Sequence, residues 1–280
     1  MINIWSDYST QINPFYQQVL RDCAEVSKQL NIPILVVGAF ARDIIFAKHK
    51  QTVGRKTIDL DLAISVGTKE DFSAMCQYLI AKGTYKETRL AHRLIYNGLG
   101  ADLEVDLVPF GKIENPPGSI QWPDDFRMNL LGFEEALANA NPVKFGNEPE
   151  LILSVLSLPA FVILKLIAWD DRKDRSKKDA MDLRSVLKWA ADLNGFHVSE
   201  EAQQFFTDQE VDLDILAAWD LGADIRKITK TKTEKCLHRI LKDETDATDQ
   251  SRLIQAMGAR EGEDGKLIDC LKALLDGMQH

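Results

Sequence analysis

Two stretches decide the fold of this chain: Thr57-Ile-Asp-Leu-Asp-Leu-Ala-Ile64 and Ala101-Asp-Leu-Glu-Val-Asp-Leu-Val108. Their apolar residues alternate with carboxylates, which predicts β-strands whose side chains point to opposite faces in turn. Asp59 and Asp61 therefore share one face of the first strand, and Asp106 shares a face with the other carboxylates of the second. Like charges on neighbouring strands repel, and a divalent cation between them relieves the repulsion. The pattern indicates a metal site, with a solvated polar face as the alternative for either strand alone.

The segment before these strands predicts a phosphate-binding turn. A short apolar run, Ile32–Val37, ends at Gly38 and is followed at once by a stretch compatible with a helix. A helix N-terminus offers unpaired backbone N–H groups and the positive end of its dipole, and glycine lets the backbone approach a ligand closely. Such junctions are common in α/β proteins. This one gains meaning because Asp59 follows 21 positions later.

Taken together, these motifs resemble the nucleotidyltransferase superfamily typified by DNA polymerase beta. Within it, the AbiEii/AbiGii-type toxins and related predicted nucleotidyltransferases are the more similar branch. The resemblance covers about residues 30 to 190 and departs at Ala39, where the family usually has Ser or Gly. The stretches that carry it are Val37-Gly-Ala-Phe-Ala-Arg-Asp43, Arg55-Lys-Thr-Ile-Asp-Leu-Asp61, Val105-Asp-Leu-Val-Pro-Phe-Gly111, Leu164-Lys-Leu-Ile-Ala-Trp-Asp-Asp-Arg172 and Lys178-Asp-Ala-Met-Asp-Leu183.

The resemblance implies a role for each matching residue. Asp59 and Asp61 would bind Mg²⁺ or Mn²⁺, and Asp106 would be the third metal ligand and the base for the acceptor hydroxyl, with Glu104 as its alternative. Carboxylate oxygens suit such ions, and a two-metal site stabilises both the attacking and the leaving oxygen of an in-line displacement. Lys165 would complete the catalytic set by contacting the triphosphate. Further nucleotide contacts are implied for Gly38, Ala39, Arg42, Arg55, Thr57, Asp179 and Asp182, of which Asp182 fits the family's register better than Asp179.

A helix is predicted from Pro159 onward, because Phe161, Leu164 and Ile167 repeat at helical spacing. Lys165 sits inside this apolar stretch, where an arbitrary lysine would usually extend to solvent. The run Arg172-Lys-Asp-Arg-Ser-Lys-Lys178 follows it. Such a run is either a solvated loop or a surface for an acidic acceptor such as RNA.

Composition indicates an ordinary globular protein and excludes several classes. The chain has 280 residues, of which 45% are hydrophobic and 28% charged, and a net charge of -9. That charge argues against a general nucleic-acid binder, although a local basic patch is compatible with tRNA. The four cysteines show no metal-binding spacing and predict reduced thiols. Without a membrane-length apolar run or a signal-like N-terminus, we expect a cytoplasmic protein with no membrane partner.

The predicted fold class is α+β: a small mixed β-sheet nucleotidyltransferase core with helices packed on it, followed by a helical C-terminal part. Residues 1–150 are expected to form the catalytic core and residues 151–280 a helical domain, with 151–190 completing the active site. The resemblance says little about 196–280. The expected helices are 9–30, 39–48 and 68–82, and the expected strands are 33–37, 57–64, 92–97 and 101–109.

The resulting functional hypothesis is an enzyme that transfers a nucleoside monophosphate from an NTP, such as ATP, to a hydroxyl. The acceptor would be RNA, for example tRNA, or a protein. The biological role would be that of a toxin in a toxin–antitoxin or phage-defence system, with an antitoxin protein as a partner. Two alternatives remain: an antibiotic-type small-molecule adenylyltransferase, and a catalytically inactive module that binds a nucleotide or a protein.

Overall fold

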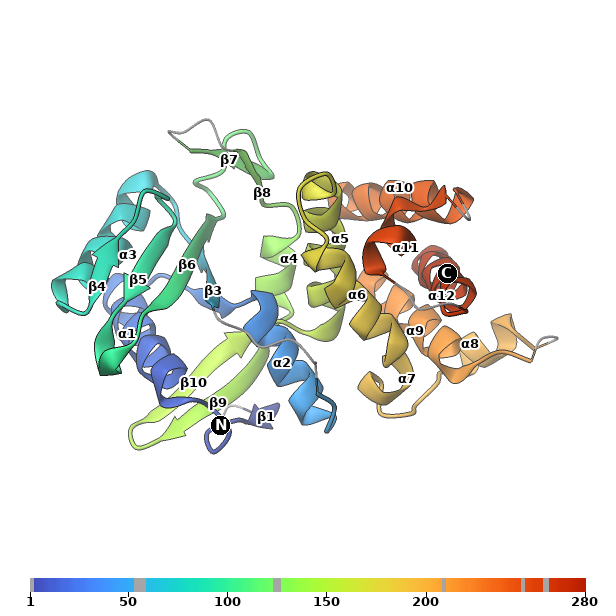
Figure 1. Ribbon diagram of the computed structural model, residues 1–280, viewed down its shortest axis with the longest axis horizontal. Coiled ribbons are helices and arrows are strands. Elements are labelled where there is room, and N and C mark those ends of the chain that lie inside the picture. Colours follow the sequence, from blue (N-terminus) through green and yellow to red (C-terminus); the bar gives the residue numbers. More distant parts are fainter. Residues whose placement is uncertain (1–2, 53–58, 123–126, 208–209, 248–249, 259–261) are drawn as a thin grey trace. The chain divides into compact units, whose positions relative to one another are not determined.

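The computed structural model describes residues 3–52, 59–122, 127–207, 210–247, 250–258 and 262–280. Its chain divides into two compact units (Figure 1). The first unit comprises residues 1–44 and 54–157, and the second comprises residues 45–53 and 158–280.

The first unit is built on an eight-stranded mixed sheet with the order β1-β9-β10-β2-β3-β6-β5-β4. The pairs β1/β9, β10/β2 and β3/β6 are parallel, and the other neighbours are antiparallel. A separate two-stranded sheet pairs β7 with β8. The strands are β1 Ser6–Asp7, β2 Ile34–Val36, β3 Asp59–Ser65, β4 Tyr85–Glu87, β5 Arg93–Tyr96, β6 Leu103–Phe110, β7 Ser119–Gln121, β8 Arg127–Asn129, β9 Asn141–Asn147 and β10 Glu150–Val155.

Local capping signals start the helices of this unit. Asn13 caps α1 (Pro14–Leu30) by accepting from the Phe15 N–H, and Pro14 occupies the first turn, where its missing N–H costs nothing. Thr68 and Asp71 form a capping box at the start of α3 (Lys69–Ala81). Helix α4 (Phe133–Ala138) is shorter, and α2 (Gly38–Lys48) begins in this unit and continues into the second.

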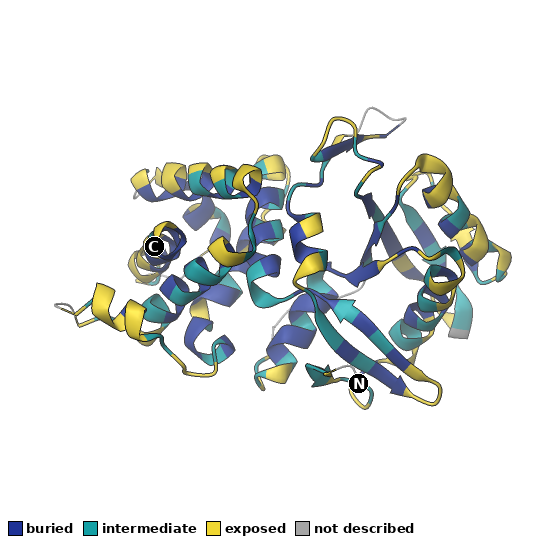
Figure 2. Ribbon diagram, turned by 180° about the vertical axis from the view of Figure 1, so that it is seen from behind, coloured by how far each residue is buried: buried dark blue, intermediate teal, exposed yellow. Residues whose placement is uncertain are grey.

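The second unit is helical. Glycines bring α9 and α12 unusually close: a Cβ added at Gly277 would lie 1.9 Å from the Trp219 carbonyl oxygen, and one at Gly222 2.1 Å from that of Leu274. Figure 2 shows how the helices alternate buried and exposed faces, as amphipathic helices around a core do. The helices are α5 Leu158–Arg172, α6 Lys178–Lys188, α7 Ala190–Leu193, α8 Glu200–Phe205, α9 Leu213–Ile228, α10 Thr231–Asp246, α11 Arg252–Met257 and α12 Asp264–Gln279.

The mixed sheet followed by helices agrees with the predicted fold class, and every helix and strand expected between residues 9 and 109 is present. The sheet extends beyond the expected boundary at residue 150, because β10 pairs with both β9 and β2. The first unit therefore ends at Ser157. All four cysteines are free thiols. Among the described residues, no helix has both the length and the apolar character needed to cross a membrane.

Candidate active site

The carboxylates of β3 and β6 form a row on one face of the sheet. These strands pair in parallel, with Asp59 opposite Glu104 and Asp61 opposite Asp106. Residues in register on neighbouring strands point to the same face, about 4.8 Å apart. We refer to Asp59, Asp61, Glu104 and Asp106 as the acidic row. Its opposite face is apolar and buried, so the strands are held in place by the core while the row stays on the other side.

The Gly38 turn lies directly against this row. Gly38 has a φ of 66°, and a Cβ added to it would stand 1.9 Å from the Asp61 Oδ2 atom. The Val37 N–H also donates to the Asp61 carbonyl at 3.0 Å. Glycine is needed here for both its left-handed backbone and its missing side chain. The N-terminus of α2 is thereby placed beside a carboxylate of the acidic row, as a site for an anion and its counter-cation would require.

Arg93 neutralises one end of the row. It faces Asp106 in the antiparallel register of β5 and β6. Its Nε and one terminal nitrogen donate to the two oxygens of Asp106 at 2.6 and 2.8 Å, and its other terminal nitrogen pairs with Glu104. Such a two-pronged arginine–carboxylate contact is among the stronger hydrogen-bonded ion pairs. The guanidinium therefore neutralises the two carboxylates of β6.

This contact bears directly on the expected metal site. Within the part of the chain that the structure describes, no group of three or more His, Cys, Asp or Glu side chains is arranged to hold a metal ion. Asp59 and Asp61 supply the oxygen donors that Mg²⁺ or Mn²⁺ prefers. Asp106 already accepts a hydrogen bond from Arg93 at each of its oxygens, so a cation bound there competes with the guanidinium. The donor chemistry therefore fits a divalent cation, and at Asp106 that cation competes with Arg93.

The field of the carboxylates reaches a neighbouring tyrosine. Burial and the negative charges of Asp59 and Asp43 together raise the pKa of Tyr16 above its ordinary value. Tyr16 also stacks on Phe40 of α2, with ring centroids 5.0 Å apart. The negative charge of Asp59 therefore acts on Tyr16 as well as on Arg93, which favours cation binding at that end of the row.

Replacing Arg93 with Met is expected to lower the free energy of unfolding by about 2 kcal/mol without added metal, since it leaves a buried carboxylate without its cation. Millimolar Mg²⁺ should restore part of this stability, because a cation bound at Asp106 replaces the guanidinium. Urea unfolding with and without Mg²⁺ measures both effects. Arg127→Met removes an exposed strand arginine and serves as the control. Equal stability of the Arg93 variant and the parent would show that Arg93 is not the counter-ion of the row.

In the second unit, Lys165 belongs to a buried ionic cluster. Its ammonium lies 3.1 Å from Asp179 and 2.7 Å from Asp182, while Arg172 donates to both oxygens of Asp179 at 2.6 and 2.9 Å. Asp179 is fully buried, and the Lys165 side chain is 12% exposed. Helices α5 and α6 thus present these residues to one another. The alternative that Lys165 extends to solvent is wrong, and its contact with a triphosphate stays a prediction.

Opposite charges inside the cluster outweigh its burial. Burial alone lowers the pKa of Lys165, but the charges of Asp182 and Asp179 raise it above the usual value. Burial likewise raises the pKa of Asp179, but the hydrogen bond from Arg172 and the charge of Lys165 bring it below the usual value. A carboxyl with a lowered pKa stabilises the fold above its unfolded pKa, near 3.9, and a lysine with a raised pKa does so below about 10.4. The cluster therefore stabilises fully between those limits.

We expect Lys165→Met to lower the free energy of unfolding by about 3 kcal/mol at pH 7, because two buried carboxylates lose a cation. The difference from the parent should shrink as the pH falls below about 4, where the carboxylates become protonated. Chemical unfolding across a pH series tests this. The control is Lys188→Met. Lys188 lies on the same helix as Asp179 and forms an exposed ion pair with Glu263, so this variant should lower the free energy of unfolding by about 0.5 kcal/mol or less. A pH-independent decrease of the same size in both variants would contradict the assignment.

The remaining predicted site residues differ in their surroundings. Gly38 and Ala39 stand at the start of α2, beside the acidic row. Arg42 is 1% exposed and its guanidinium donates to Asp43 at 2.7 Å, so its expected nucleotide contact stays a prediction. Arg55 and Thr57 lie outside the described residues.

The basic run between α5 and α6 is partly neutralised. Arg172 binds Asp179 and Lys173 lies 2.8 Å from Asp170. Arg175, Lys177 and Lys178 remain exposed. The charge available to an acidic acceptor is therefore smaller than the sequence suggests.

Sequence reasoning missed Arg93 and Tyr16. Arg93 stands in a strand that was expected, but its position opposite Asp106 follows from the pairing of β5 with β6. The usable signal is that a basic residue on a strand next to an acidic row finds its partners across the sheet. Tyr16 gives no such signal, because helical periodicity places it only at the edge of the apolar face of α1.

The fold and the site define a class of protein: a mixed sheet that carries carboxylates on two parallel strands beside a glycine turn. No family model matches this sequence, and the search of curated proteins finds no match. Several solved structures match the chain at low sequence identity. An antigenic nucleotidyltransferase-like protein from Paracoccidioides brasiliensis is 15% identical with a TM-score of 0.43, covering 85% of this chain and 92% of its own.

Two further structures extend the comparison. The CCA-adding enzyme of Thermotoga maritima, complexed with tRNA, is 11% identical with a TM-score of 0.26, covering 96% of this chain and 82% of its own. ANT(2")-Ia in complex with adenylyl-2"-tobramycin is 15% identical with a TM-score of 0.31, covering 56% of this chain and 78% of its own. These values describe a likeness in fold, and no functional conclusion follows from them.

Proposed function

We propose that this chain is a metal-dependent nucleotidyltransferase that transfers a nucleoside monophosphate from an NTP to a hydroxyl acceptor. The observation that carries the proposal is the register of β3 and β6, which puts Asp61 beside Asp106 while Gly38 packs its backbone on the Asp61 carboxylate. Oxygen donors in a row, next to a helix N-terminus that suits phosphate, are what transfer of a phosphoryl group requires.

The chemistry assigns a task to three members of the acidic row. Asp59 and Asp61 would hold Mg²⁺ or Mn²⁺, and Asp106 would join them after releasing Arg93. The bound ions would supply positive charge for the developing negative charge at the α-phosphate. The acceptor oxygen forms a bond to the α-phosphorus, the bond to pyrophosphate breaks, and the hydroxyl proton passes to Asp106. The N–H groups at the start of α2 would bind phosphate oxygens.

For the acceptor, we propose RNA, such as tRNA, or a protein. The support for an acidic acceptor is local: Arg175, Lys177 and Lys178 are exposed on a chain whose net charge is -9. A toxin acting in a toxin–antitoxin or phage-defence system, restrained by an antitoxin protein, is the biological role that the sequence resemblance suggests. For Lys165 we retain the contact with the triphosphate as a proposal, since its ammonium has three N–H donors and two carboxylates beside it.

A second candidate function is an inactive module that binds a nucleotide without transferring it. The specific observation in its favour is Arg93, whose guanidinium occupies both oxygens of Asp106 and also pairs with Glu104. If that contact persists when the nucleotide binds, the positive charge of Arg93 disfavours a divalent cation at Asp106.

The two candidates are separated by incubating the protein with each α-labelled NTP, Mg²⁺ and either total tRNA or cell lysate. Transfer of label to an acceptor supports the enzyme. Stabilisation of the protein by NTP and Mg²⁺ without any transfer supports the inactive module. The absence of both would reject the nucleotide-binding site itself.

If RNA is the acceptor, replacing Arg175, Lys177 and Lys178 with Gln should weaken RNA binding and flatten its dependence on salt. Removing one phosphate contact lowers the slope of log affinity against log salt by about 0.7 for a single strand. Binding of NTP should be unaffected. Replacing the exposed Lys227 and Lys242 with Gln is the control. An unchanged slope in the first variant would mean that the run is only a solvated connection.

A further inference from the structure

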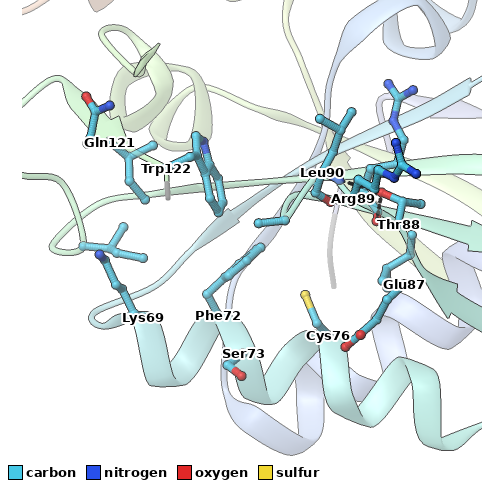
Figure 3. A pocket seen from close by; sticks show the side chains of 15 residues that line it. Lys69, Phe72, Ser73, Cys76, Glu87, Thr88, Arg89, Leu90, Gln121 and Trp122 are labelled. Carbon is cyan, nitrogen blue, oxygen red and sulfur yellow. Dashed lines mark hydrogen bonds between the residues drawn. The ribbon is translucent and has the colours of Figure 1, made fainter. Parts of the chain in front are cut away.

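A cavity of about 410 Å³ opens in the first unit between α3, the turn that joins β4 to β5, and β7 (Figure 3). Its volume lies in the range of pockets that hold small organic molecules. The walls combine aromatic and aliphatic side chains with several charged ones. The lining includes Lys69, Phe72, Glu87, Arg89, Arg93 and Trp122.

The floor of the cavity suits a flat ring. Phe72 and Trp122 meet edge to face with centroids 5.5 Å apart, and Figure 3 shows both rings within the cavity. Leu90, a large apolar side chain in the β4–β5 turn, also lines the cavity and is 39% exposed. Aromatic and aliphatic walls of this kind bind ligands by burying apolar surface and by ring contacts.

The charges around the cavity suit an anion. Lys69, Arg89 and Arg93 line it, against the single carboxylate of Glu87. Lys69 and Arg89 make no side-chain ion pair or hydrogen bond within the described part of the chain, so their charges are available to a ligand.

We propose that this cavity binds a small aromatic anion, its ring against the Phe72–Trp122 pair and its phosphate or carboxylate attracted by the charges of Lys69 and Arg89, and that Arg93 couples its occupancy to the acidic row. Arg93 is the shared residue, since it lines the cavity and also holds Asp106. A ligand anion attracts this guanidinium and weakens its hold on Asp106. The carboxylate then becomes a better metal ligand, and this coupling rests on the proposed function.

Binding is tested by calorimetric titration with phenyl phosphate, compared with inorganic phosphate and phenol. Phenyl phosphate should bind at least about tenfold more tightly than either, because only it offers both the ring and the charge. The double variant Lys69→Gln/Arg89→Gln should weaken it about tenfold, and Leu90→Glu, an exposed change that needs no repacking, should weaken it as well. Lys28→Gln, an exposed lysine on α1, is the control. Equal affinity for the parent and the double variant would overturn the site.

The coupling is tested by repeating the titration with Mg²⁺. Because coupling between sites is reciprocal, Mg²⁺ should tighten phenyl phosphate binding about threefold or more in the parent and leave it unchanged in Asp106→Asn. Neither titration requires nucleotide transfer, so failure of the proposed activity would leave the binding result standing. If the affinity of the parent for phenyl phosphate does not change when Mg²⁺ is added, the proposed coupling role of Arg93 is overturned.

Discussion

Gly38→Ala is expected to lower the free energy of unfolding by about 3 kcal/mol or more and to abolish nucleotide binding. An alanine at a φ of 66° is strained by about 1 kcal/mol, and its Cβ would meet the Asp61 Oδ2 atom at 1.9 Å. Relieving that clash displaces either the carboxylate or the turn, and overpacking of this kind costs a further 1–3 kcal/mol, roughly. Both displaced groups belong to the proposed phosphate and metal site.

Gly195→Ala separates the effect of backbone strain from the effect of the clash with Asp61. Gly195 has nearly the same φ, 65°, but a Cβ added there meets nothing within 4 Å. Its substitution should therefore cost only the backbone strain, about 1 kcal/mol. Urea unfolding of both variants measures the difference, and thermal melting with NTP and Mg²⁺ measures binding. Equal destabilisation of the two variants would show that Gly38 serves the backbone conformation alone.

The double variant Asp59→Asn/Asp61→Asn is expected to lose transferase activity by roughly a thousandfold or more, because the cations that stabilise the reacting phosphate lose both ligands on β3. Its stability without ligand should equal or exceed that of the parent, since like charges on one face are removed. The rise in melting temperature caused by NTP and Mg²⁺ should vanish, because that rise depends on binding to the native state.

Asp102→Asn is the matched control for this variant. Asp102 is an exposed carboxylate just before β6 and lies outside the acidic row. Its substitution removes the same kind of charge but leaves all the proposed metal ligands in place. Activity should therefore stay within about twofold of the parent. A double variant that keeps its Mg²⁺-dependent stabilisation would exclude Asp59 and Asp61 as the metal ligands.

Local sequence signals predicted much of the first unit. The strands around Asp59 and Asp106 follow from alternation with a period of two, and the helix expected at 68–82 is present as α3. These signals depend only on residues close together in the sequence. The boundary at residue 150 could not be read in this way, because β10 belongs to the sheet through pairing with a strand far away in the sequence.

In the candidate site, too, some features depend on the local sequence and others on tertiary packing. Which carboxylates share a strand face is a property of the chain itself. The partner of each carboxylate depends instead on the fold. The guanidinium bound to Asp106 belongs to Arg93, which lies on another strand. Lys165 likewise resembles a surface lysine in an apolar helix, and only the packing of α5 on α6 encloses it with Asp179 and Asp182.

The sequence by itself determined the acidic faces of β3 and β6, the glycine turn before α2 and the helical character of the C-terminal half, because each depends on backbone geometry over one element. Only the tertiary structure decided that β3 and β6 run in parallel with Asp61 beside Asp106, since parallel neighbours are joined by a long crossover whose packing sets the register. It also decided that Arg93 holds one end of the row, because an ion pair across strands depends on which strands become neighbours.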